Sequence, residues 1–156
     1  IHMSDALPSA KVLFRVPNDD GTAEVETLWA FHLGGDRYRL DNLPFFAYGV
    51  SVADVILAPH VEEEGFPTFQ QVLEKSGNRT IRVIFEPPLA PGNQSRVLLD
   101  QLVSLGVEYE GANPTYVVLN IPPEVDFEGV VKVLLDAQVQ WEHADPTYDE
   151  VHESAG

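Results

Sequence analysis

The chain has 156 residues, with 25 acidic against 9 basic side chains, a formal net charge of −16 and no cysteine. This charge disfavours nucleic acids and anionic membrane surfaces as partners, and the lack of cysteine excludes disulfides and zinc–thiolate sites. Hydrophobic residues make up 44% of the chain, enough for a buried core, and no apolar run approaches the ~18 residues that span a bilayer. We therefore expect a cytoplasmic protein that binds neither nucleic acid nor membrane.

The N-terminal part of the chain is predicted to form short strands. Residues 1–10 are interpreted as a tag remnant, Ile1-His2-Met3, followed by a polar lead-in. Alternating or β-branched segments predict strands at residues 11–16, 24–33, 37–40, 50–58 and 69–75, with an exposed loop at 60–67. Residues 76–79 are predicted as a hairpin turn that leads into a strand at 80–86. Frequent turns between short strands indicate a small, curved sheet or barrel over residues 11–78.

The second part of the chain mixes helices with strands. Leucines at helical spacing predict a helix over 94–105 that ends at Gly106, and Asp126 is a candidate N-cap of a second helix. Strands are predicted at 107–110, 115–121 and 139–142. Together with strand 80–86, the order is β-α-β-β-α-β, which is typical of a ferredoxin-like domain over residues 79–144. The predicted fold class is α+β, a small curved sheet or barrel half followed by this half, with an acidic flexible tail at 145–156.

Acidity is concentrated toward the C-terminus. Residues 1–85 carry 12 acids and 7 bases, whereas residues 86–156 carry 13 acids and only Arg96 and Lys132 as bases. Such a charge steers basic partners toward the second half. The candidate partner-binding residues are the acids on or after its edge strands and three aromatic side chains near them: Glu108, Tyr109, Glu110, Tyr116, Trp141, Glu142 and Asp145.

The arginines support a second interpretation. Arg15, Arg37, Arg39, Arg79 and Arg82 make up five of the nine bases, and we expect most of them to form ion pairs within this acidic chain. The alternative is a pocket for an anionic small ligand in a regulatory or sensor module. Its candidate residues are Arg37, Arg39, Asp41, Asn42, Tyr48 and Arg79.

Catalytic signatures are missing from the sequence. There is no phosphate-binding glycine loop, no G-x-S-x-G and no H-E-x-x-H, and no two histidines lie one helical turn apart. We therefore expect no metal, no cofactor and no enzymatic activity. A catalytic reading of Asp41, His32 and Arg39 would require these three groups to converge in one cleft.

Several motifs resemble a bacterial family, the domain of unknown function family 4265. They are Leu28-Trp29-Ala30, Tyr38-Arg39-Leu40-Asp41-Asn42, Pro44-Phe45-Phe46-Ala47-Tyr48-Gly49-Val50-Ser51, and Ser76-Gly77 with Arg79-Thr80. The resemblance runs from about Phe14 to about Glu142. This chain departs from the family at Ala53, where glycine is usual, and at Asn78, where histidine is usual. The resemblance implies a small stand-alone bacterial protein, of the kind often encoded beside toxins as an immunity partner.

The leading hypothesis is therefore a non-enzymatic acidic binding protein. In its most concrete form it is an immunity or antitoxin protein that occludes a basic toxin domain. Small size, strong acidity and the missing catalytic signatures point the same way.

Overall fold

The computed structural model describes residues 7–155 and has a mixed α+β fold, as the sequence predicts. The chain divides between Ser76 and Gly77 into two compact units, called unit 1 and unit 2 below. No helix in the described part of the chain is long and apolar enough to cross a membrane.

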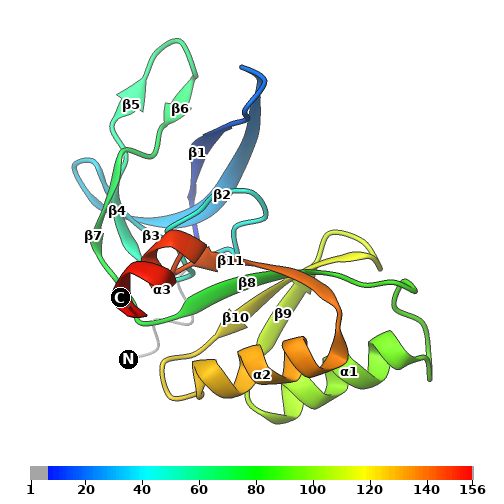
Figure 1. Ribbon diagram of the computed structural model, residues 1–156. Coiled ribbons are helices and arrows are strands. Elements are labelled where there is room, and N and C mark those ends of the chain that lie inside the picture. Colours follow the sequence, from blue (N-terminus) through cyan, green and yellow to red (C-terminus); the bar gives the residue numbers. More distant parts are fainter. Residues whose placement is uncertain (1–6, 156) are drawn as a thin grey trace. The chain divides into compact units, whose positions relative to one another are not determined.

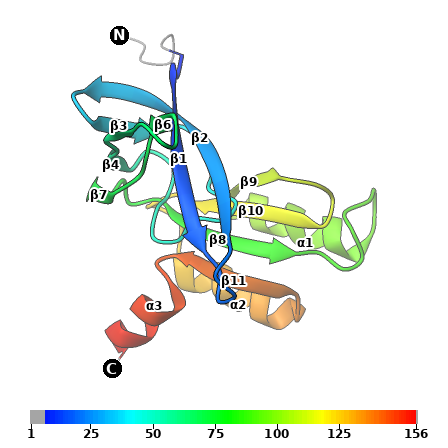
Figure 2. The same cartoon turned by 90° about the horizontal axis from the view of Figure 1, so that it is seen from above.

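Unit 1 consists of strands (Figures 1 and 2). They are β1 (Ala10–Pro17), β2 (Ala23–Gly34), β3 (Arg37–Leu40), β4 (Val55–Leu57), β5 (His60–Val61), β6 (Phe66–Pro67) and β7 (Gln71–Glu74). Five of them form an antiparallel sheet in the order β1-β2-β3-β4-β7, and β5 and β6 form a separate hairpin. Figure 2 shows β1 and β2 side by side.

The core of unit 1 follows from the two-residue alternation of its strands. Val12 and Phe14 of β1 share one face with Leu28 and Ala30 of β2, and all four are buried. The ring of Phe69 stacks on Phe14 at 4.8 Å between centroids. The opposite face of β1 carries Lys11 and Arg15, whereas Glu24 and Glu26 of β2 lie on the same side as Leu28 and Ala30.

The sequence predicts a curved sheet or a barrel, and the barrel alternative is wrong because the five-stranded sheet is open rather than closed on itself. Within the described residues, β1 meets the segment before β7 through one isolated bridge, Leu13 with Thr68, and a hydrogen bond from Phe69 N to Leu13 O. Among residues 7–155, no continuous ladder closes the sheet between β1 and β7. The strands of unit 1 therefore form a curved open sheet.

Unit 2 contains one antiparallel sheet and three helices. Its elements are β8 (Arg79–Ile84), α1 (Gln94–Ser104), β9 (Glu108–Gly111), β10 (Tyr116–Ile121), α2 (Phe127–Ala137), β11 (Gln140–Asp145) and α3 (Tyr148–Ala155). The sheet order is β11-β8-β10-β9. Helices α1 and α2 lie together on one face of this sheet (Figure 1).

Local sequence signals explain the ends of α1. The side chain of Asn93 accepts a hydrogen bond from Arg96 N and caps the first turn. Gly106 follows the C-cap with φ of +104°, a conformation that favours glycine. Leu99 and Leu102 then project into a core that also contains Val117 and Leu119 of β10.

Four segments differ from the sequence-based predictions. Strand 50–58 shrinks to β4, because residues before Val55 form a loop, and the loop predicted at 60–67 contains the β5–β6 hairpin. Residues 76–79 are no hairpin turn, since β7 and β8 belong to different sheets. The tail predicted from residue 145 onward instead contains the end of β11 and helix α3.

Candidate functional site

The predicted partner-binding residues lie on both faces of the sheet of unit 2. Glu110 of β9 pairs with Val118 of β10, and Glu108 pairs with Asn120. Since the alternate β10 residues Val117 and Leu119 pack into the helix-covered core, both glutamates occupy the face opposite α1 and α2. We call this face of the sheet the acidic face.

Two rows of side chains cross the acidic face from β9 to β11. One row contains Glu110, Val118, Arg82 and Glu142, and the other contains Glu108, Asn120, Thr80 and, after an irregularity in β11, Asp145. Tyr116 occupies the same face next to Ile84. Five of the seven predicted partner-binding residues therefore share this face, although Asp145 among them is buried, with 5% exposure.

The arginine in the first row carries the main ion pair of the acidic face. Arg82 is only 2% exposed, and its Nε donates to Glu142 Oε1 at 3.0 Å. Glu142 itself is exposed. A buried guanidinium needs an acceptor, because an uncompensated buried charge is costly. Glu142 thus has a structural role in addition to the binding role predicted for it.

The second row contains a buried amide. Asn120 is 2% exposed, and its Nδ2 donates to Glu108 Oε1 at 2.9 Å and to Asn78 Oδ1 at 3.3 Å. Its Oδ1 has no hydrogen-bond partner in the described part of the protein. The amide orients the Glu108 carboxylate, since a donor on one oxygen restricts the rotation of that side chain.

Strand β9 forms one edge of the sheet and is exposed along its whole length. Among residues 7–155, neither Glu108 nor Glu110 forms an ion pair with a basic side chain. Their charges face solvent side by side on an edge strand. This arrangement attracts a basic surface and repels an acidic one.

Tyr109 and Trp141 point to the helix-covered side instead. Tyr109 pairs with Leu119 of β10. The side chain of Tyr109 forms a hydrogen bond with Arg96 of α1. This hydrogen bond and the negative charge of Asp100 raise the pKa of Arg96. Trp141 packs against the core beside His143, with 4.8 Å between ring centroids. These two aromatic residues therefore contact their own unit rather than project from the acidic face.

His143 lies in an aromatic cluster with Trp141, Phe127 and Tyr148. Burial lowers the pKa of His143, and the charge of His152 lowers it further. Its Nδ1 has no hydrogen-bond partner within the described residues. Burial among these rings therefore favours the neutral form of the imidazole.

The residues of the alternative ligand pocket have separate contacts. Arg37 pairs with Glu74 at 3.6 Å, and the Arg39 guanidinium lies 5.1 Å from the centroid of the Phe31 ring. Asn42 Oδ1 accepts the backbone N–H of Trp29 at 2.7 Å. These contacts give Asn42 a structural role, because it holds the loop that follows β3 to strand β2.

Of the other three residues of that pocket, Asp41 adjoins Asn42, whereas Tyr48 and Arg79 lie farther along the chain. Asp41 is exposed, and its backbone N–H donates to Trp29 O at 2.9 Å. Tyr48 lies in the loop before β4 and is 46% exposed. Arg79 begins β8 in unit 2, where its Nη2 donates to the carbonyls of Pro122 and Val125 at 2.6 and 2.7 Å.

Sequence reasoning missed the carboxylates that hold the loop between β3 and β4. Glu26 accepts three backbone N–H groups, from Phe45, Phe46 and Ala47, at 2.8–3.0 Å. These contacts join residues about 20 positions apart, so no local pattern reveals them. They fix the two phenylalanines of the loop, whose role the sequence left open.

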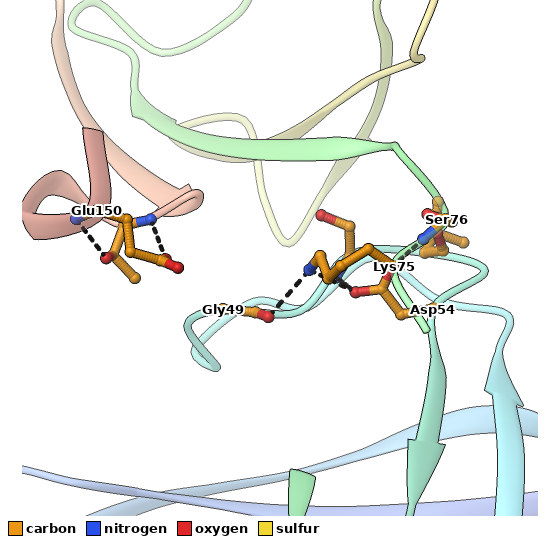
Figure 3. A network of polar contacts seen from close by, with 8 residues as sticks. Gly49, Asp54, Lys75, Ser76 and Glu150 are labelled. Atoms are coloured by element: carbon orange, nitrogen blue, oxygen red, sulfur yellow. Dashed lines mark hydrogen bonds and ion pairs between the residues drawn. The ribbon is translucent and has the colours of Figure 1, made fainter. Parts of the chain in front are cut away.

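Asp54 is the second of these carboxylates and is fully buried (Figure 3). Its carboxylate accepts hydrogen bonds from Lys75 Nζ at 2.7 Å, from Ser76 N at 2.8 Å and from Ser51 N at 2.9 Å. Lys75 Nζ also donates to Gly49 O at 3.1 Å. Asp54 therefore ties the loop to the end of β7 within unit 1.

The predicted absence of a metal site remains a prediction. The described residues contain no group of three or more histidine, aspartate or glutamate side chains able to hold a metal ion. His32 Nε2 contacts Gly35 O at 2.7 Å, and Arg39 contacts Phe31, so two of the three residues that a catalytic reading would require have other contacts.

Comparisons with known proteins agree with the fold. A family model described as Domain of unknown function (DUF4265) matches residues 26–144. The protein of a structure titled "Novel crystal structure of a hypothetical protein from Neisseria gonorrhoeae" is similar to this chain, with 15% identity and a TM-score of 0.74. The similarity covers 89% of this chain and 96% of that one. A search of curated proteins found no match.

Proposed function

This chain belongs to the DUF4265 family, and we propose that it is a non-enzymatic acidic protein that binds a basic protein partner. The observation that carries the proposal is the pair of glutamates on edge strand β9. Both are exposed, both point to the acidic face, and neither is neutralised by a cation among residues 7–155.

The most concrete form of this function is that of an immunity protein. An acidic protein that covers a basic toxin domain blocks access to the toxin's own target, and opposite charges speed the encounter. We also propose a cytoplasmic location, and a ferredoxin-like class for unit 2 based on its β-α-β-β-α-β order and its sheet order. The alternative, a sensor for an anionic small ligand, has less support because Asn42 and Arg37 are engaged in contacts of their own.

The test begins with capture of the partner. The full chain is immobilised and exposed to a lysate of its source organism that includes the products of neighbouring genes, at low and at high salt. A basic protein retained at low salt and released as salt rises is the expected result, since screening weakens attraction between exposed charges. Retention of no basic protein would remove the main support for the proposal.

Purified partner then allows a test of the surface. Reversing both charges, Glu108→Lys with Glu110→Lys, is expected to lower the association rate at low salt by about 10-fold. The matched control is Glu62→Lys with Glu63→Lys, which makes the same change in net charge in the exposed loop between β5 and β6 of unit 1. Equal slowing by both pairs would show that net charge alone acts and that β9 is not the contact surface.

A further test asks whether binding neutralises the partner. The partner is expressed in cells with the wild-type chain or with the β9 double variant, and growth is measured. Rescue by the wild type and loss of rescue by the variant are expected. An unaffected rescue by the variant would contradict the role of Glu108 and Glu110.

A further inference from the structure

The outer face of the unit 1 sheet differs from the rest of this acidic protein. Its core face contains Val12 and Phe14 of β1, so Lys11, one residue before Val12, points to the opposite face, and the same alternation places Trp29 and Phe31 of β2 on that face. Trp29 is 42% exposed, although tryptophan is usually covered. An apolar surface therefore remains accessible on this face.

Two cations lie on these aromatic rings. Lys11 and Trp29 are cross-strand partners, with Nζ 4.8 Å from the centroid of the indole ring. Phe31 and Arg39 are cross-strand partners in the same way, with the guanidinium carbon 5.1 Å from the centroid of the phenyl ring. We call Lys11, Trp29, Phe31 and Arg39 the cation–aromatic face.

The cations of this face differ from their neighbours in having no carboxylate partner. Arg15 on the same side of β1 makes a two-pronged contact with Glu64, and Arg37 on the same side of β3 pairs with Glu74. In the described part of the chain, Lys11 and Arg39 form no ion pair with an acidic side chain. In a chain with 25 acids, two uncompensated cations on one face are unexpected.

We propose that the cation–aromatic face binds an acidic, partly apolar segment of another protein. Carboxylates of the segment would pair with Lys11 and Arg39, and an apolar side chain between them would cover Trp29 and Phe31. A cation that contacts an aromatic ring keeps its charge, and its N–H groups on the other side can still donate hydrogen bonds to a carboxylate.

The strand geometry sets the spacing of the two carboxylates. Lys11 and Arg39 are two strands apart and offset by two residues, a separation of about 12 Å from the usual strand spacing and rise. In an extended peptide, residues i and i+4 lie on one side at about 13 Å, with residue i+2 between them. A peptide that fits this face therefore has an acidic residue at position i, an apolar residue at i+2 and a second acidic residue at i+4.

Other anionic partners fit this face less well. A nucleic acid strand presents a phosphate at every nucleotide and needs several cations along its path, whereas this face offers two cations, Lys11 and Arg39, that form no ion pair within residues 7–155. An anionic membrane is repelled at longer range by a net charge of −16. An acidic segment with few charges and an apolar centre matches both the number of cations and the exposed indole.

The test uses a synthetic peptide that contains Glu-Ser-Leu-Ser-Glu and a counterpart that contains Gln-Ser-Leu-Ser-Gln, with the full chain followed by NMR. The chain has two tryptophans, and Trp141 of unit 2 provides an internal control for Trp29. The glutamate peptide is expected to shift the indole N–H signal of Trp29 in the millimolar range and to leave that of Trp141 in place. The glutamine peptide is expected to bind at least several-fold more weakly.

Variants separate charge from folding. Lys11→Gln with Arg39→Gln is expected to abolish the Trp29 shift while the amide spectrum of the core stays unchanged. Asp41→Asn, which removes an exposed carboxylate that follows Arg39, is expected to tighten peptide binding about twofold. The proposal is overturned if neither peptide shifts Trp29, if both bind equally, or if a single-stranded oligonucleotide shifts Trp29 where the glutamate peptide does not.

Discussion

Removal of the Asp54 side chain is expected to destabilise unit 1 by about 4 kcal/mol. The change Asp54→Ala leaves the buried backbone N–H of Ser51 and the partly buried N–H of Ser76 without their acceptor, and each such loss costs roughly 1–3 kcal/mol. Lys75 adds little, because its side chain is 46% exposed and water can take the place of the carboxylate.

Urea unfolding followed by tryptophan fluorescence measures this effect. In a Trp141→Phe background, the remaining Trp29 lies in unit 1 and reports its unfolding. Asp41→Ala is the matched control, since it removes an exposed carboxylate and is expected to change stability by less than about 0.5 kcal/mol. A loss below about 1 kcal/mol for Asp54→Ala would refute the view that this carboxylate holds the loop.

Three further predictions concern single residues. Glu26→Gln is expected to cost about 1–3 kcal/mol in urea unfolding, because an amide cannot accept all three N–H groups of residues 45–47; an unchanged midpoint would contradict this role. The pKa of His143 is lower in the folded state than in the unfolded state. As the pH decreases below about 6.5, the unfolded state therefore binds a proton more readily than the folded state, and the free energy of unfolding decreases. The difference in unfolding free energy between wild type and His143→Phe should therefore depend on pH between 7.5 and 5.5, and a constant difference would contradict it. Gly106→Ala is expected to lower the melting temperature by several degrees, because φ is +104° and the new Cβ would lie 2.9 Å from a Val125 methyl carbon; an unchanged melting temperature would refute this.

Regular periodicity made most elements predictable. The leucines of α1 follow the helical period, and β10 is a short apolar run that ends before Pro122, so sequence reasoning located both to within one or two residues. The turn at 76–79 was misread because glycine and asparagine occur in links between units as well as in hairpins. Helix α3 was missed because an acidic segment with few apolar residues resembles a frayed tail.

The candidate site was predictable only in part. Alternation in β9 correctly places Glu108 and Glu110 on one face, but the face to which Tyr109 points depends on where α1 packs. The contacts of Asp54 and Glu26 span about 20 residues of chain. Contacts at such separation arise from tertiary packing, and a single sequence contains no local signal for them.

The alternation of β9 also has a consequence for substitutions on this strand. Tyr109 contacts α1 and stabilises the unit, whereas Glu108 and Glu110 lie on the opposite side of the same short strand. Substitutions at the two glutamate positions alter the charge of the acidic face and leave the helix-side contacts in place. A substitution at Glu110 therefore changes the charge of this edge strand at little cost in stability, whereas a substitution at Glu108 also removes an acceptor of the buried Asn120 amide.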